Sequence, residues 1–109
     1  MAMEEEAVVV LEALPFQPLS ELLDAGLPPH GYTTTLDNLN IALVVNGRDP
    51  VYQVAGFGTD AATLATYLGI RMFTPDPVMS AGVAGGFKAR GAEIGTIYVS
   101  EDSVRYFDR

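Results

Sequence analysis

The sequence predicts an α/β protein, with a layered α/β/α arrangement around a mixed β-sheet. Apolar, β-branched runs alternate along the chain with segments that carry helix start and stop signals. A Gly-rich string over residues 80–91 directly follows the short apolar run Val78-Met79. In open α/β sheets, a turn of this kind at the end of a strand is where ligands bind. At 109 residues, the chain has room for one domain.

The first two predicted elements are a strand and a short helix. Residues 7–11 are apolar throughout and mostly β-branched, which predicts a strand covered on both faces. Residues 20–25 have the composition of a short helix, introduced by Pro18 and ended by Gly26 and the prolines after it.

An antiparallel hairpin is predicted next. Residues 32–35 and 41–45 are strand-like, and Asp37-Asn38 between them supplies turn chemistry. Asn46-Gly47 and Asp49-Pro50 then mark a second turn.

The second half of the chain predicts one helix and two further strands. Residues 61–70 carry apolar side chains at helical spacing, with Thr59 as the expected N-cap. Residues 78–79 and 94–100 are the predicted strands. No helix signal follows the last strand, so we expect an incomplete sheet. We therefore interpret residues 1–109 as a single, truncated portion of a domain.

Composition excludes several classes of partner. The net charge is −8, from 6 basic and 14 acidic residues, which argues against binding to nucleic acid. The chain has no cysteine and only one histidine, so we expect no metal and no cofactor. No apolar run approaches the length of a membrane span, and the acidic start is unlike a secretory signal. We therefore expect a cytoplasmic protein with no membrane partner.

The Gly-rich string has four glycines and three alanines among its twelve residues. Such density removes Cβ atoms where the backbone must turn sharply or approach a ligand. The string resembles the Gly-rich strand-loop of the nucleoside phosphorylase and nucleosidase family, and is closest to its plant-type 5′-methylthioadenosine (S-adenosylhomocysteine) nucleosidase branch. Four other segments resemble the family in the same order along the chain: residues 12–16, 39–44, 56–59 and 104–109.

The resemblance implies a nucleoside phosphorylase-like fold of which this chain matches only the N-terminal part. Family members are more than twice as long. Their later half carries a Met-Glu pair that grips the ribose and an Asp that protonates the purine, and no segment here resembles either. The implied function is a purine nucleosidase that hydrolyses the N-glycosidic bond of 5′-methylthioadenosine-type nucleosides. As a short chain, it is expected to be inactive or weakly active.

By this resemblance, Glu12 is the catalytic carboxylate that activates water. Its expected place, just after the strand at residues 7–11, would hold the side chain rigidly in the ligand crevice. A competing alignment uses Glu4, Glu5 and Glu6, because some bacterial nucleosidases contain a similar string after their first strand. Since the string here precedes the predicted strand, it is interpreted as a solvated acidic tail.

The resemblance also implies the residues that bind the substrate, a small-molecule purine nucleoside. Backbone groups of Val83, Ala84 and Gly85 are expected to approach the purine and ribose, and Gly58 and Thr59 belong to the family's Gly-rich second βα turn. Val83 stands where the family commonly has Ser or Thr, so a hydroxyl partner is missing.

Two other functions fit the same residues. Val83 and Phe107, which stands where bacterial relatives have His, favour a non-catalytic nucleoside-binding or storage-type relative, together with the missing leaving-group acid. The third hypothesis is a purine nucleoside phosphorylase, although no arginine lies close enough in sequence to suggest a phosphate clamp. For all three, we expect a homodimer or association with a full-length relative.

Overall fold

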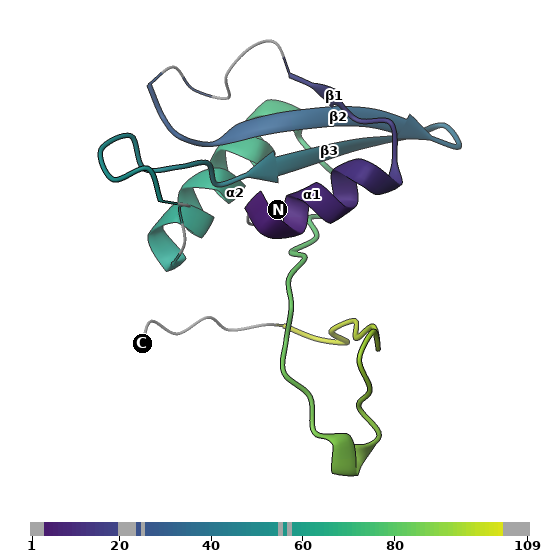
Figure 1. Ribbon diagram of the computed structural model, residues 1–109. Coiled ribbons are helices and arrows are strands. Elements are labelled where there is room, and N and C mark those ends of the chain that lie inside the picture. Colours follow the sequence, from purple (N-terminus) through teal and green to yellow (C-terminus); the bar gives the residue numbers. More distant parts are fainter. Residues whose placement is uncertain (1–3, 20–23, 25, 55, 57, 104–109) are drawn as a thin grey trace.

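The computed structural model describes residues 4–19, 24, 26–54, 56 and 58–103. In this part, three strands form one sheet and helices pack against it (Figure 1). The elements, in chain order, are α1 (Glu4–Ala13), β1 (Gln17–Pro18), β2 (His30–Leu36), β3 (Leu39–Val45), α2 (Thr59–Phe73) and the 3₁₀ turn η1 (Lys88–Arg90). Neither of the two described α-helices is long and apolar enough to cross a membrane.

The predicted hairpin is confirmed. β2 and β3 pair antiparallel, in a register that sets His30 opposite Val45 and Leu36 opposite Leu39. Asp37 and Asn38 connect them with φ values of 46° and 65°. Two consecutive positive φ angles are typical of the tight hairpin turns whose twist matches that of the strands. β1 adds two residues to the free edge of β2, so the sheet order is β1-β2-β3 and the described pairs are all antiparallel.

The layers follow from the alternation of side chains along β3. Leu43 and Val45 are buried on one face, where Val10 and Leu11 of α1 pack against them. Val44 points to the other face, where the glycine of α2 at position 69 comes close. The two helices therefore lie on opposite faces of the hairpin, as the α/β/α prediction requires (Figure 1).

The prediction of a strand at residues 7–11 is wrong, because these residues lie in α1. A short apolar run is compatible with either a strand or a buried helix, and here packing against the sheet decides for the helix. Only one side of α1 packs against the sheet. Val10 is half-buried against the sheet, whereas Val8 and Val9 are more than half exposed. The acidic residues that begin α1 are a sequence signal typical of a helix start.

The prediction of a helix at residues 61–70 is confirmed, although α2 is longer and passes through Gly69. Its N-cap is Gly58, one residue before the predicted cap Thr59. A Cβ atom at Gly69 would lie 3.1 Å from Cγ2 of Val44, so glycine allows the helix to approach β3 closely. The helix ends at Phe73, and the C-cap residue Thr74 has a left-handed backbone whose N–H donates to the carbonyl oxygen of Ile70.

The strands predicted at residues 78–79 and 94–100 are not formed. Both segments are exposed, and within the described ranges no neighbouring strand pairs with them. A strand needs a partner for its backbone hydrogen bonds, so β-like composition alone is insufficient. The short helix predicted at residues 20–25 lies outside the described residues, except for Asp24.

Candidate functional site

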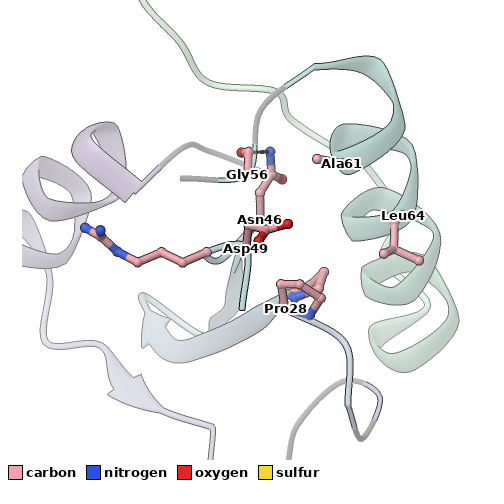
Figure 2. Close-up of a pocket in the computed structure, with 8 residues that line it drawn as sticks. Pro28, Asn46, Asp49, Gly56, Ala61 and Leu64 are labelled. Atoms are coloured by element: carbon pink, nitrogen blue, oxygen red, sulfur yellow. Dashed lines mark hydrogen bonds between the residues drawn. The ribbon is translucent and has the colours of Figure 1, made fainter. Parts of the chain in front are cut away.

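A pocket of about 160 Å³ lies between the end of the hairpin and the start of α2 (Figure 2). The segment before β2, the loop after β3 and the first turns of α2 all contribute to it. The lining residues are Pro28, Pro29, Asn46, Arg48, Asp49, Gly56, Ala61 and Leu64. Figure 2 shows Asn46 and Asp49 close together, with Pro28 and, on α2, Leu64 both to one side of them.

Asn46 is the buried polar residue of this pocket, with only 6% of its surface exposed. Its Nδ2 donates a hydrogen bond to the carbonyl oxygen of Gly56 at 3.1 Å. In return, the N–H of Gly56 donates to the carbonyl oxygen of Gly47 at 2.7 Å. The Oδ1 of Asn46 is buried and accepts no hydrogen bond from the described residues. Asn46 thus fastens the end of β3 to the chain that leads into α2.

The loop between these two contacts is held by Asp49. One carboxylate oxygen of Asp49 accepts from the backbone N–H groups of Val51 and Tyr52, both at 2.8 Å. Its backbone also exchanges hydrogen bonds with Gln53 and Val54. The turn predicted at Asp49-Pro50 is therefore confirmed. Because its carboxylate is used for this turn, we interpret Asp49 as a structural acid of the pocket wall.

Gly58 and Thr59 lie at the entrance to α2, next to the pocket residues Gly56 and Ala61. Gly58 has a φ of 97°, which side chains rarely permit, and it is exposed. Its carbonyl oxygen accepts from the N–H of Ala62, the first bond of the helix. Of the predicted substrate-binding residues, these two adjoin the pocket.

Glu12 lies near the end of α1 and is exposed. The predicted role of Glu12 depends on a rigid position at the carboxyl end of a strand, and the structure does not provide that position because residues 7–11 lie in α1. Glu12 is not among the residues that line the pocket.

Val83, Ala84 and Gly85 lie in the segment after α2 that runs away from the sheet (Figure 1). All three are exposed, and no atom lies within 4 Å of a Cβ added at Gly85. The glycine next to it, Gly86, is closely approached, since a Cβ there would lie 2.6 Å from Cβ of Ala92. The predicted site residues therefore fall into three separate places: α1, the start of α2 and this segment.

Other expected features can be placed as well. His30 is the first residue of β2, where its ring meets that of Tyr32 edge to face at 5.7 Å. Arg48 lines the pocket and donates from Nη1 to the carbonyl oxygen of Gln53, whereas Arg71 lies in the last turn of α2. No group of three or more His, Cys, Asp or Glu side chains gathers within the described ranges.

Sequence reasoning missed Asn46 as a site residue, because it interprets Asn46-Gly47 only as a turn. The overlooked signal is position. Asn46 directly continues the apolar run at residues 41–45, where the backbone is still buried. A polar residue in such a place needs internal hydrogen-bond partners, which marks it as a structural or binding residue.

Comparisons with known proteins agree on one family. A family model described as the phosphorylase superfamily matches residues 1–109. The chain is 35% identical over its whole length to the 5′-methylthioadenosine nucleosidase of Arabidopsis thaliana, and covers 41% of that protein. It is 38% identical over 98% of its length to the 5′-methylthioadenosine/S-adenosylhomocysteine nucleosidase of Colwellia psychrerythraea, and covers 38% of it.

A solved structure gives the same result. The apo form of the Arabidopsis thaliana 5′-methylthioadenosine nucleosidase superposes with a TM-score of 0.76 at 32% identity. The match covers 86% of this chain and 40% of that one. The chain thus spans about two fifths of the length of these relatives, in their N-terminal portion.

Proposed function

Because the chain belongs to the phosphorylase superfamily, we propose that it forms the N-terminal portion of a purine nucleosidase acting on 5′-methylthioadenosine-type nucleosides. Its described part has the nucleoside phosphorylase-like α/β fold. The observation that carries the proposal is the 35% identity to the Arabidopsis nucleosidase, which extends over the whole of this chain. The reaction is hydrolysis of the bond between the ribose and the purine.

This reaction sets two requirements. Breaking the bond develops oxocarbenium-like charge on the sugar, as in other glycoside hydrolyses. One acid must protonate the leaving purine, and one carboxylate must activate water or stabilise the cation. We propose that this chain supplies the carboxylate, and that the acid comes from the part of the fold to which this chain has no counterpart.

Two places along α1 can supply the carboxylate. Glu12 remains a candidate by resemblance, from an exposed position near the end of the helix. The string Glu4–Glu6 is the second candidate. The reason to interpret it as a tail is its place before a predicted strand, but residues 7–11 belong to α1, and the string is the beginning of that helix. We therefore favour Glu6, the last residue of this string, over Glu12.

The substrate-binding residues complete the proposal. The exposed backbone of Val83, Ala84 and Gly85 is accessible to a purine nucleoside, and Gly58 and Thr59 present the start of α2. A helix N-terminus with a glycine before it offers backbone N–H groups to an oxygen of the ligand. The proposed site requires these two segments and a carboxylate of α1 to meet when the fold is complete.

A chimera tests this function. Residues 1–109 would replace the matching N-terminal portion of the Arabidopsis nucleosidase, and adenine release from 5′-methylthioadenosine would be measured without phosphate. We expect release at a rate well above that of an otherwise identical chimera whose Val83-Ala84-Gly85 segment is replaced by three prolines. Release that strictly requires phosphate would instead indicate a phosphorylase.

One observation favours a second function, a non-catalytic nucleoside-binding or storage-type relative. Val83 cannot offer the hydroxyl group that the family commonly has at this position. A folded chimera that binds 5′-methylthioadenosine but releases no adenine would support this function and contradict the nucleosidase. Isothermal titration calorimetry measures binding of 5′-methylthioadenosine, and the adenine-release assay measures its hydrolysis, so together they distinguish a binding protein from a nucleosidase. The expected association as a homodimer, or with a full-length relative, stays a prediction.

A further inference from the structure

Asn46 joins the two ends of the loop between β3 and α2. Its Nδ2 donates to the carbonyl oxygen of Gly56 at 3.1 Å, ten residues further along the chain. The N–H of Gly56 donates to the carbonyl oxygen of Gly47 at 2.7 Å, so both polar groups of the Gly56 backbone are used. The approach is close, since a Cβ atom at Gly56 would lie 3.2 Å from that same carbonyl oxygen. Gly56 is therefore fixed relative to the end of β3.

The loop that these bonds close also has hydrogen bonds of its own. The N–H of Asp49 donates to the carbonyl oxygen of Val54 at 2.8 Å, and the N–H of Gln53 donates to the carbonyl oxygen of Asp49 at 2.9 Å. The Asp49 carboxylate accepts from two further N–H groups of the loop. A loop whose ends meet and whose interior is bonded behaves as a compact unit. The contact between Asn46 and Gly56 therefore sets where its far end lies.

The start of α2 follows directly from this contact. Gly58, the N-cap of α2, comes two residues after Gly56 and has no side-chain cap. Nothing lies within 4 Å of a Cβ atom added at Gly58. The rest of α2 is held farther along, where Leu68 is buried and Gly69 comes close to Val44. Without the hold on Gly56, we expect the first turn of α2 to move while the helix stays on the sheet.

Packing alone does not account for an asparagine at position 46. The residue is only 6% exposed, and its Oδ1 accepts no hydrogen bond from the described residues. A buried carbonyl oxygen without a partner is costly, and an apolar side chain of the same shape would avoid that cost. What asparagine adds over such a side chain is the hydrogen bond to Gly56. Its contribution therefore lies in holding the segment that leads into α2.

We propose that Asn46 is a positioning residue for substrate binding. It acts through Gly56, by setting the place of the turn at Gly58 and Thr59. This role rests on the proposed function, in which that turn binds the purine nucleoside. Because Asn46 is buried behind the turn's anchor, its effect is on the affinity for substrate and not on bond breaking.

Amide hydrogen exchange of the 109-residue chain tests the positioning without substrate. In Asn46→Leu, which keeps the shape and removes the donor, we expect the N–H groups of Gly56 and Ala62 to exchange at least about tenfold faster. The N–H of Thr74, at the other end of α2, should exchange at an unchanged rate. Asn46→Ser is the second variant. Its side chain is one bond shorter and stays polar, so it serves if the leucine variant does not fold.

Steady-state kinetics of the chimera gives the functional result. We expect Asn46→Leu to raise KM for 5′-methylthioadenosine at least about tenfold and to leave kcat within about twofold, because a displaced binding turn weakens substrate and transition state alike. A merely structural loss lowers the amount of folded enzyme, which lowers the apparent kcat at unchanged KM. Asn40→Leu is the matched control and should change neither. Asn40 is an exposed residue of β3 whose Oδ1 accepts from Thr35.

Two results would overturn the positioning role. One is exchange of Gly56 and Ala62 that is no faster in the Asn46 variants than in Asn40→Leu, and the other is a fall in kcat with KM unchanged. Failure of the proposed function has a different signature, since the unsubstituted chimera would then release no adenine. The exchange rates of the 109-residue chain would still decide whether Asn46 holds the start of α2.

Discussion

At the scale of single residues, the pocket depends on glycine where the chain turns from β3 toward α2. Gly47 has a φ of 79°, and a Cβ atom there would lie only 2.1 Å from the carbonyl oxygen of Pro28. Its neighbour Asn46 anchors the same turn through Gly56. The sequence predicts a turn at Asn46-Gly47, but it does not predict that Pro28, eighteen residues earlier, closes over it.

Gly47→Ala tests this contact. We expect it to lower the free energy of unfolding by more than about 1–3 kcal/mol, the usual cost of one strained backbone position, because a steric clash is added to the strain. Gly26→Ala is the matched control. Gly26 has a similar φ of 85°, and nothing lies within 4 Å of its added Cβ. Urea unfolding of both variants measures the difference, and equal losses would show that the Pro28 contact is unimportant.

At the scale of elements, local signals suffice where partners are close in sequence. The hairpin and α2 are predicted correctly, because turn residues, β-branched runs and helical spacing act over a few residues. α1 is not predicted correctly, because its apolar run is compatible with either a strand or a helix, and only packing against the sheet decides between them. The strands predicted at residues 78–79 and 94–100 are not formed, for the complementary reason. Their composition is β-like, but a strand forms only when a neighbour pairs with it.

The identity of α1 as a helix decides which carboxylate is tested. In the active chimera, we expect Glu6→Gln to lower kcat by about 10²–10⁴-fold, the usual contribution of a positioned acid or base. Glu12→Gln should leave kcat within about twofold, because Glu12 is exposed and away from the pocket. Steady-state kinetics of adenine release gives both values. A larger loss of kcat in Glu12→Gln than in Glu6→Gln would identify Glu12 as the catalytic residue.

At the scale of the whole molecule, the chain has two parts: the elements from α1 to α2 form the layered part, and residues 74–103 run away from the sheet (Figure 1). The end of β3, from Leu43 to Val45, is buried between α1 on one face and α2 on the other, which gives this part a small core. The Gly-rich string at residues 80–91 lies in the second part, outside that core, and its residues are exposed. This separation explains why the family and fold are evident from the sequence while the geometry of the site is not. In the part of the chain that the structure describes, the predicted site residues lie in three separate places: α1, the start of α2 and the segment after α2.

We propose that this chain supplies one part of a nucleosidase site. The most direct test measures adenine release from 5′-methylthioadenosine, without phosphate, by the 109-residue chain alone and by its complex with the remaining portion of the Arabidopsis nucleosidase. We predict no release by the chain alone and release by the complex, abolished by Glu6→Gln. Release by the chain alone, or none from a folded complex, would contradict the claim.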